Sequence, residues 1–261
     1  MKKLLLLALI TFSTLFSACL FEDDEEEWDA AKVCPEAGTN AYGDPNRGTF
    51  VDERDGRVYK YTTIGDQVWM AENLKYELPY PYSLCYGMEA CKLRNLYYQD
   101  TVHVCTRDTT HLAEIAQRMQ STCTDNDCIA AEWCEKVGRC YSLMDGDLMN
   151  NPLVDTLCPK GWHLPSKQEW DVMFDEMGRK KDGDFYKRLE SRNMQIFDGS
   201  DECGFSVMPA DVVYSEFFAY FWTSTVMRLG IPNGIDFGKN TYSSNYELYR
   251  KSPRVRCVKD D

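Results

Sequence analysis

The chain has 261 residues, a formal net charge of −13 at pH 7 and a hydrophobic fraction of 44%, with aromatic residues at 13%. This length suits one large domain or two small ones, and the aromatic content argues for a packed core rather than disorder. A strongly acidic chain is repelled by nucleic-acid phosphates and by anionic lipid head groups. We therefore expect no nucleic-acid partner and no membrane attachment through charge alone.

Residues 1–18 have the layout of a secretory signal peptide. Two lysines open the segment, an apolar run extends from Leu4 to Phe16, and small residues precede Cys19. The run is too short to form a stable membrane-spanning helix. The stretch Leu15–Cys19 resembles the lipobox of bacterial lipoproteins, in which cleavage precedes a lipid-bearing cysteine. We therefore expect lipidation at Cys19, with an ordinary signal peptide and a chance cysteine as the alternative.

Residues 19–47 are predicted to form an acidic tether and linker. Six consecutive acids, Glu22–Glu27, repel one another and remain solvated, and residues 30–47 are loop-like. Acidic runs after the lipid cysteine resemble the surface-export signal of Bacteroidetes-type lipoproteins. We expect a lipid-anchored outer-membrane protein exposed at the cell surface, with the periplasmic face as the alternative.

The cysteine count predicts disulfide bonds in an oxidising compartment. Of twelve cysteines, Cys19 is assigned to lipid, which leaves 12 − 1 = 11, an odd number. At least one of the eleven must stay reduced or pair between chains. Zinc is the rival interpretation, but Cys123, Cys128, Cys134 and Cys140 lack the tight C-x₂-C spacing of structural zinc sites. We expect no metal ion and no cofactor.

The folded domain is predicted to span residues 48–261 and to begin with β-strands. Residues 50–61 have the pattern of a hairpin with its turn at Asp55-Gly56. A second turn at Gly65-Asp66 leads into Gln67–Met70, which completes a three-stranded meander.

Residues 91–137 are predicted to be a small helical insertion held by disulfides. Thr110–Met119 has the pattern of a helix, and Ile129–Lys136 is a second candidate. Five cysteines lie between 91 and 134.

The second half of the domain is predicted to contain a central helix followed by strands. Ser166 and Glu169 form an S-x-x-E capping box, so a helix should begin at about Lys167, and Gly178 can end it. Trp170, Met173, Phe174 and Met177 give that helix one apolar face. Phe185–Leu189 is a candidate short helix, and strand-like pieces occur at 204–208, 220–224 and 254–258. Strands on both sides of a helical section predict an α+β domain closed by its own termini.

Several motifs occur together in an order that resembles the Fibrobacter succinogenes major paralogous domain family. The matching motifs are Asp55-Gly56, Gln67–Leu74, Cys85-Tyr86, Gly138–Tyr141, Cys158–Pro165 with Glu169-Trp170, Gly204–Ser206, Phe221–Thr225 and Val255–Val258. The resemblance spans roughly residues 50–259 and is interrupted by the insertion, which is not a family feature. This chain departs from the family pattern at Asp211, where glycine is expected, at Cys203, where tyrosine is frequent, and in the sequence Val137–Tyr141.

The resemblance implies a fold and two disulfides. Through the motif at Gly161–Trp170 the family looks related to the C-type-lectin-like and formylglycine-generating-enzyme folds. Lectin-like domains link a cysteine near the first helix to one in the last strand, which implies a Cys158–Cys257 bond. The family resemblance also implies a Cys85–Cys134 bond. Cys91, Cys105, Cys123, Cys128 and Cys140 would then staple the insertion in an order that the sequence leaves open.

No catalytic constellation emerges from the sequence. Glu72 and Glu169 are a possible carboxylate pair for glycoside hydrolysis, but the capping box accounts for Glu169 and a family core turn for Glu72. His163 is assigned a structural role beside the helix start. Asp125–Asp127 is the nearest cluster for calcium and lies in the insertion. An enzyme related to the formylglycine-generating fold would need a reactive cysteine late in the chain, and Cys203 is the candidate.

The leading functional hypothesis is a non-catalytic, surface-tethered binding or adhesion domain. Tyrosine rings can stack on sugars, and Tyr80, Tyr82, Tyr242 and Tyr246 are the candidate binding residues, with ordinary half-buried packing as the alternative. The expected partners are the membrane, through the lipid anchor, and a polysaccharide or a cell-surface protein. A formylglycine-generating-like enzyme and a structural envelope protein are the alternative functions, because fold resemblance does not fix function.

Overall fold

The computed structural model describes residues 27–79, 82–85, 89–92, 104–107, 112–141, 152–192, 199–208, 211–213, 216–226, 232–238, 241–244 and 253–260. The predicted signal peptide, Cys19, Tyr80 and Tyr246 lie outside these ranges. Within them, no helix has both the length and the apolar character needed to cross a membrane.

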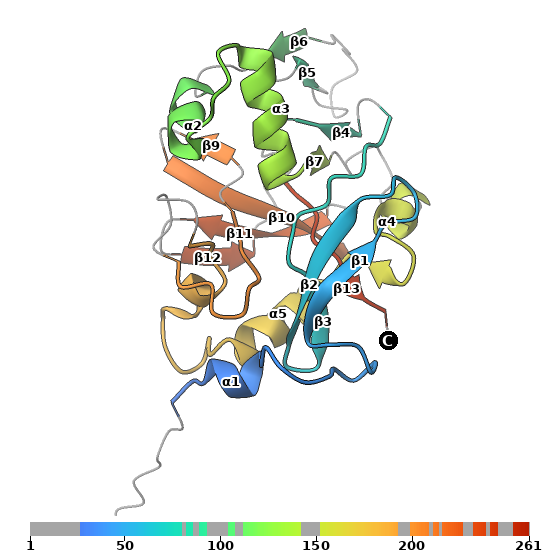
Figure 1. The fold of residues 1–261 in the computed structure, drawn as a ribbon, viewed down its shortest axis with the longest axis vertical. Helices are drawn as coiled ribbons and strands as arrows, with labels where there is room; N and C mark the ends of the chain where they lie inside the picture. Colours follow the sequence, from blue (N-terminus) through green and yellow to red (C-terminus); the bar gives the residue numbers. More distant parts are fainter. Residues whose placement is uncertain are drawn as a thin grey trace, which may run out of the picture.

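Helices and strands alternate irregularly along the described chain (Figure 1). The helices are α1 (Ala30–Val33), α2 (Leu112–Met119), α3 (Asn126–Val137), α4 (Pro152–Leu157), α5 (Lys167–Glu176) and the 3₁₀ helix η2 (Phe185–Arg188). The strands are β1 (Arg47–Val51), β2 (Val58–Ile64), β3 (Gln67–Met70), β4 (Ser83–Leu84), β5 (Glu89–Lys92), β6 (Val104–Arg107), β7 (Cys140–Tyr141), β8 (Trp162–His163), β9 (Asp211–Val213), β10 (Glu216–Val226), β11 (Pro232–Gly238), β12 (Thr241–Ser244) and β13 (Val258–Lys259). The molecule is therefore a mixed α and β protein, as the sequence pattern predicts.

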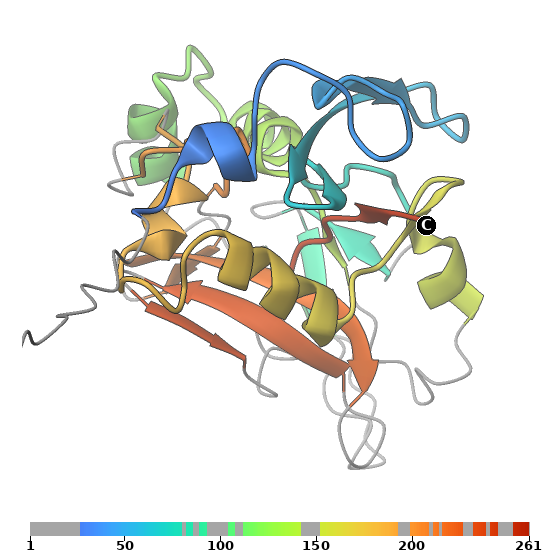
Figure 2. The same ribbon diagram turned by 90° about the horizontal axis from the view of Figure 1, so that it is seen from below.

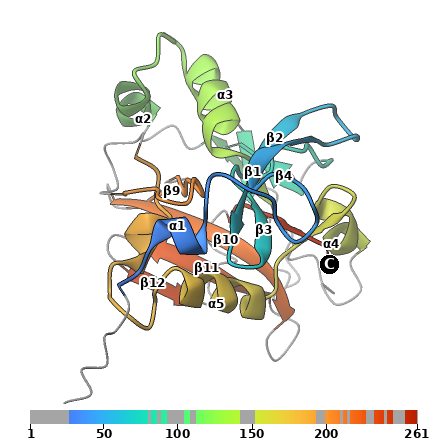
Figure 3. The ribbon, with the colours of Figure 1, turned by 60° about the horizontal axis from the view of Figure 1, so that its bottom comes forward.

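A five-stranded antiparallel sheet joins the two ends of the domain. Its strand order is β1-β2-β3-β13-β8. The predicted meander is confirmed: β1 and β2 pair from Arg47↔Thr62 to Val51↔Val58, and β2 pairs with β3. Gly56 has φ +74° in the first turn, a conformation that glycine adopts without strain. Figure 3 shows the β1–β2 hairpin projecting beyond the rest of this sheet.

The last strand of the chain lies inside this sheet. Val258 pairs with Trp69 on one side and with His163 on the other. The domain is therefore closed by its own ends, as predicted. The strand is shorter than the expected 254–258, because only Val258 and Lys259 join the ladder, whereas Arg254 makes an isolated bridge to Phe221.

A second antiparallel sheet, β12-β11-β10-β9, packs against α5. Figure 2 shows α5 between this sheet and the N-terminal part of the molecule. Trp170 of α5 is fully buried, and its ring lies 4.8 Å from Trp69 of β3 and 5.3 Å from Phe221 of β10. Phe205 and Phe237 meet the same indole edge-on at 5.9 and 6.2 Å. One helix thus supplies the apolar surface that joins the two sheets.

The predicted boundaries of α5 are confirmed by its cap. Ser166 Oγ accepts a hydrogen bond from the backbone N–H of Glu169, and the Glu169 carboxylate accepts one from the backbone N–H of Ser166. Helix formation begins at Lys167 because this box satisfies two otherwise unpaired N–H groups. The chain leaves the helix at Gly178, which has φ +93°.

Two local predictions need correction, and one helix has no predicted counterpart. Residues 185–188 form a 3₁₀ helix, η2, one residue shorter than the predicted element. Residues 204–208 form no strand and contribute one isolated bridge, Glu190↔Val207. Helix α4 was not predicted. Its last carbonyls, of Thr156 and Leu157, accept hydrogen bonds from Arg54 Nη1 at 2.7 and 2.8 Å, so the β1–β2 turn holds this helix end.

The insertion is a lobe with its own small core. Helices α2 and α3 bury a shared apolar cluster of Leu112, Ile115, Met119, Ile129, Ala130, Trp133 and Val137. Helix α3 begins at Asn126, earlier than the predicted Ile129, because Asp125 Oδ1 accepts the N–H of Cys128 and caps the helix. The lobe is not wholly helical, since β5 pairs with β6 there.

Four disulfides cross-link the described residues. They are Cys34–Cys203, Cys85–Cys134, Cys123–Cys128 and Cys158–Cys257. Both pairs implied by the family resemblance are thus present. Of the cysteines assigned to the insertion, Cys123 and Cys128 close its helix–helix turn, and the backbones of Cys91 and Cys105 face each other in β5 and β6. Cys140 lies outside these four bonds, and its Sγ accepts a hydrogen bond from Arg254 Nη1 at 2.6 Å.

Removing the long-range disulfide is expected to destabilise the domain more than removing the short one. The sequence separations are 99 residues for Cys158–Cys257 and 5 for Cys123–Cys128. The chain-entropy model assigns about 4.7 kcal/mol to a loop of roughly 100 residues and about 2 kcal/mol to one of about five. We expect C158S/C257S to lower the free energy of unfolding by about 2–5 kcal/mol and C123S/C128S by about 2 kcal/mol or less. Urea denaturation measures both, and equal losses would contradict the entropic account.

Candidate functional site

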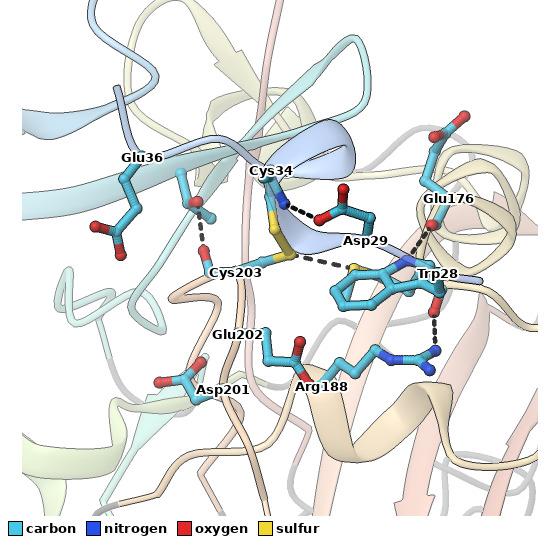
Figure 4. The surroundings of a disulfide bond; sticks show 12 residues. Trp28, Asp29, Cys34, Glu36, Glu176, Arg188, Asp201, Glu202 and Cys203 are labelled. Atoms are coloured by element: carbon cyan, nitrogen blue, oxygen red, sulfur yellow. Dashed lines mark hydrogen bonds between the residues drawn. A yellow bond between two sulfur atoms is a disulfide. The ribbon is translucent and has the colours of Figure 1, made fainter. Parts of the chain in front are cut away.

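The segment from Trp28 to Asn46, here called the N-terminal strap, is part of the folded domain. The prediction of a tether and linker over residues 19–47 is therefore wrong for residues 28–47, while residues 19–26 lie outside the described ranges. Trp28 Nε1 donates to the carbonyl of Glu176 at 2.8 Å, and the Arg188 guanidinium lies 4.3 Å from the Trp28 ring centroid (Figure 4). Asp29 then caps α1 by accepting the N–H of Ala31. The strap is therefore attached to the end of α5 and to η2 before it reaches β1.

A buried disulfide fixes the strap to the body of the domain. Cys34 directly follows α1 and bonds to Cys203, and these residues are 2% and 0% exposed (Figure 4). Cys203 Sγ also lies 3.5 Å from Met177 Sδ at the end of α5. Cys203 was the candidate nucleophile of the enzyme hypothesis. Because its sulfur is bonded to Cys34, that hypothesis loses the thiol on which it depended.

The loop around Cys203, residues 199–208, is held by polar contacts from several elements. The Asp201 carboxylate accepts hydrogen bonds from the Ser206 backbone N–H at 2.8 Å and from its hydroxyl at 2.5 Å. Thr62 of β2 donates its hydroxyl to the Cys203 carbonyl at 2.6 Å, and Arg47 of β1 donates to the Glu202 carbonyl at 3.0 Å. The disulfide therefore connects the strap to a loop that is itself bound to the five-stranded sheet.

Arg256 supports the same loop from inside the core. Its guanidinium lies 4.4 Å from the Phe205 ring centroid, donates to the carbonyls of Phe205 and Ser206, and donates twice to Asn73 Oδ1. Complete burial lowers the pKa of Arg256 to about 9, and the nearby Asp201 and Glu72 charges oppose that effect. The group is therefore cationic at neutral pH, stabilised by hydrogen bonds and a ring face.

The rest of the strap is ordered by side-chain hydrogen bonds to the backbone. Asn40 Oδ1 accepts the N–H groups of Tyr42 and Asp44 at 3.0 and 3.1 Å, which closes a turn. Buried Asn46 donates to the carbonyl of Ala37 at 2.8 Å. These contacts fix the position of Tyr42 on the surface of the domain.

Four aromatic rings gather on one face of the five-stranded sheet. This set, here called the aromatic face, consists of Tyr42, Phe50, Tyr61 and Trp162. Phe50 stacks on Trp162 with ring centroids 4.3 Å apart, and Tyr61 lies 6.5 Å from the same indole. Tyr42, Phe50 and Tyr61 are half-buried against the core, whereas Trp162 is 9% exposed. Three rings thus present part of their surface to solvent, and two of them, Phe50 and Tyr61, contact the more buried Trp162.

Gly48 makes room for Tyr61 on this face. The two residues are cross-strand partners in β1 and β2, and a Cβ on Gly48 would lie 2.6 Å from the Tyr61 hydroxyl oxygen. The tyrosine ring therefore covers the glycine backbone instead of extending into solvent. Burial, with the neighbouring Asp44 carboxylate, raises the pKa of Tyr61, so its hydroxyl stays protonated at neutral pH.

The cation beside the aromatic face is already paired. Lys259 of β13 lies across from Trp162 in the sheet, and its ammonium is 4.6 Å from the Tyr42 ring centroid. The same ammonium contacts Asp44 Oδ2 at 2.5 Å. The strap thus contributes both an aromatic ring and a carboxylate to this face.

The opposite face of the hairpin carries an exposed apolar pair. Val51 and Val58 are cross-strand partners, and they are 56% and 59% exposed. They form a small apolar pair near the hairpin turn, on the side of the sheet away from Phe50.

Two of the four predicted binding tyrosines, Tyr82 and Tyr242, lie within the described residues. Tyr80 and Tyr246 lie outside the described residues. Tyr82 is half-buried against the core beside β4, and Tyr242 belongs to β12 of the other large sheet. The aromatic face was missed although its pattern is readable. The turn at Asp55-Gly56 sets a register in which Phe50 and Tyr59 are opposite each other, with Tyr61 two residues further along the same face.

The two carboxylates considered for catalysis occupy separate structural positions. Glu72 accepts the backbone N–H of Lys60 at 2.8 Å. Glu169 belongs to the α5 cap and accepts a hydrogen bond from His163 Nε2 at 2.6 Å. The other imidazole nitrogen, Nδ1, lies 2.7 Å from Asp260 Oδ1. His163 therefore links the start of α5 to the end of the chain, as its predicted structural role requires.

His163 and Glu169 shift each other's pKa values. Hydrogen bonding to Glu169, and then to Asp260, raises the pKa of His163 to about 9, although partial burial opposes the shift. Burial raises the pKa of Glu169, but hydrogen bonds from His163 and Ser166 outweigh it and leave that pKa below its ordinary value. The imidazole is consequently a cation at neutral pH and has no proton-accepting nitrogen.

No group of three or more His, Cys, Asp or Glu side chains among the described residues is arranged to hold a metal ion. Three of the four cysteines of the rival zinc interpretation, Cys123, Cys128 and Cys134, are in disulfides. The calcium candidate Asp125 serves as the cap of α3.

Comparison with known families agrees with the sequence motifs. The Fibrobacter succinogenes major domain family matches residues 62–259 of the chain. Because this match covers most of the chain, the protein belongs to that family. The N-terminal strap and β1 precede the matched residues. No characterised protein and no solved structure shows a significant match to the chain, so its function has to be argued from the site.

Titration of His163 should make stability depend on pH above neutrality. The folded pKa of about 9 exceeds the ordinary value of 6.5, so the stabilisation is complete below about 6.5 and is lost as pH rises through about 9. We expect the thermal midpoint of the native protein to fall over this interval, and that of H163Q to stay lower and flat. A two-dimensional NMR titration should place the imidazole pKa near 9. A value near 6.5 would contradict the charged link.

Proposed function

We propose that the protein is a surface-tethered lipoprotein whose domain binds a neutral polysaccharide without catalysis. The observation that carries this proposal is the aromatic face. Phe50 and Tyr61 lie on the five-stranded sheet in contact with Trp162, and Tyr42 of the strap packs against the same core cluster. Faces of sugar rings carry C–H groups that pack on aromatic π surfaces, and amphipathic tyrosines suit such partly wet contacts.

The charges around the face favour a neutral ligand. Lys259 is paired with Asp44, so an acidic polysaccharide would have to displace a carboxylate to gain a counter-charge. The chain also has a net charge of −13, which repels polyanions. Hydroxyl-rich neutral sugars avoid this repulsion and can use the Tyr61 hydroxyl and the Asp44 carboxylate as hydrogen-bond partners.

A cell-surface protein is the second candidate ligand, and a different observation supports it. Val51 and Val58 expose an apolar pair at the tip of the projecting hairpin, beside the edge strand β1. Apolar contact at a strand edge is a common mode of protein recognition. A structural envelope role without a soluble ligand would leave both surfaces without a partner.

A relation to the C-type-lectin-like and formylglycine-generating-enzyme folds is part of the proposal. Three features of the chain support it. The motif Gly161–Trp170 starts α5, the Cys158–Cys257 disulfide ties that start to the last strand, and both chain ends share one sheet. The lipid anchor and the outer-membrane location are supported by the sequence of residues 1–27.

Binding through the aromatic face predicts a specific mutational pattern. We expect Y42A and Y61A each to weaken retention on insoluble neutral polysaccharides about tenfold, since truncating a central aromatic contact costs more than about 1 kcal/mol. Y61F keeps the ring and loses only the hydroxyl, so it should weaken retention much less than Y61A does. Affinity electrophoresis in gels containing neutral or acidic polysaccharides measures the effect.

The matched control is V172A, which truncates an exposed apolar side chain on α5 away from the face. Thermal melting of each variant separates loss of binding from loss of folding. If Y42A and Y61A bind polysaccharide as well as V172A and the native chain do, the aromatic face is not the binding site. If V51A/V58D alone abolishes capture of surface proteins, the second candidate replaces the first.

Lipid attachment at Cys19 predicts release on mutation. We expect C19A to appear in the soluble envelope fraction with an unchanged melting temperature, because the residue precedes the folded strap. Protease treatment of intact cells tests the orientation, and degradation of the native chain is expected only if the domain faces outward. A C19A variant that stays in the membrane fraction would contradict the anchor.

A further inference from the structure

Three features connect the start of the strap to the core of the domain. They are the Trp28 contacts, helix α1 and the Cys34–Cys203 disulfide. Entering from residue 27, the chain makes the Trp28 contacts to Glu176 and Arg188 and then forms the single turn of α1. The Cys34–Cys203 disulfide follows immediately. Cys34 lies outside the family-matched residues 62–259, whereas Cys203 lies within them. The bond therefore joins a segment that precedes the family-matched residues to the family domain.

Without this bond, tension on the N-terminus would pull β1 away from the edge of the five-stranded sheet. The strap leads directly into β1, which lies at the edge of the five-stranded sheet and pairs with β2 alone. The open end of that hairpin is Arg47↔Thr62, and the turn is at the far end. Tension at Arg47 would therefore separate the strand pairs one after another, the geometry in which hydrogen bonds resist least.

Peeling would also dismantle the aromatic face. Tyr42 and Asp44 belong to the strap, and Phe50 belongs to β1. Their removal would leave Tyr61 and Trp162 without their neighbours. A ligand held at this face would be lost under the same tension that its own attachment creates.

The disulfide offers a different path for the tension. Cys203 passes the load to a loop held by Thr62, by the Asp201–Ser206 turn and by buried Arg256. The Glu202 N–H also donates to the carbonyl of Arg188 at 3.0 Å, which joins the loop to η2. Residues 35–51 lie beyond the cross-link and carry no tension while it is intact.

We propose that the Cys34–Cys203 disulfide transmits tension from the N-terminal tether into the core of the domain and thereby spares the part of the strap that follows Cys34, together with β1 and the aromatic face. The biological use of this path rests on the tether and the binding role proposed above. Its mechanical test needs no ligand.

Single-molecule pulling tests the proposal on the chain from residue 19 carrying C19A, held by handles at its two ends. In the native protein the first low-force step should release about seven residues, 27–33, which is roughly 25 Å of chain. In C34S/C203S the first steps should extend through β1 to Val51 and release roughly 85 Å, at forces too low to unfold the native core. C123S/C128S, the matched control, should behave as the native protein does.

A second measurement covers the case in which C34S/C203S does not fold. A short ligation tag inserted beside Gly43, in an exposed turn with open space around it, moves the pulling point past the disulfide. We expect β1 to peel at low force from that point even in the native protein. If N-terminal pulling peels β1 with the disulfide intact, or if removal of the disulfide leaves the first step unchanged, the proposal is overturned. Neither result bears on polysaccharide retention, which is measured without load.

Discussion

The burial of Trp170 is the interaction on which the rest of the structure depends. Its ring meets aromatic side chains from β3, β10, β11 and the 199–208 loop. These elements come from the beginning, the middle and the end of the domain. An indole buries a large apolar area and packs well against offset or edge-on rings. Because the capping box fixes where α5 begins, it also fixes which side of the helix carries this indole.

Disulfides add covalent links to the packing around Trp170. Cys158–Cys257 ties the start of α5 to the last strand. Cys34–Cys203 ties the strap to the 199–208 loop, whose Phe205 contacts Trp170. Cys85–Cys134 attaches the insertion at the base of α3. The bonds act at places where the chain enters, leaves or branches from the core.

The aromatic face is a consequence of strand register combined with the path of the strap. The hairpin register places Phe50 and Tyr61 on one side of the sheet. The strap then adds Tyr42 and Asp44, and the last strand adds Lys259. The strap and the hairpin that follows it therefore form one surface with the last strand of the chain. The buried cation Arg256 contributes indirectly, because it supports the loop to which the strap is bonded.

The sequence by itself determined the local features and the family. The turn at Asp55-Gly56, the box at Ser166 and Glu169 and the two implied disulfides depend on nearby residues or on recognisable motifs, and the structure contains all of them. Only the tertiary structure decided that the strap is folded and that Cys203 bonds to Cys34. A loop-like sequence carries no signal of what it packs against, because its order comes from long-range contacts such as Trp28 with Arg188. The hairpin turn is enough to place Phe50 and Tyr61 on one face, but no local pattern shows that Tyr42 and Trp162 join them, because those contacts are long-range.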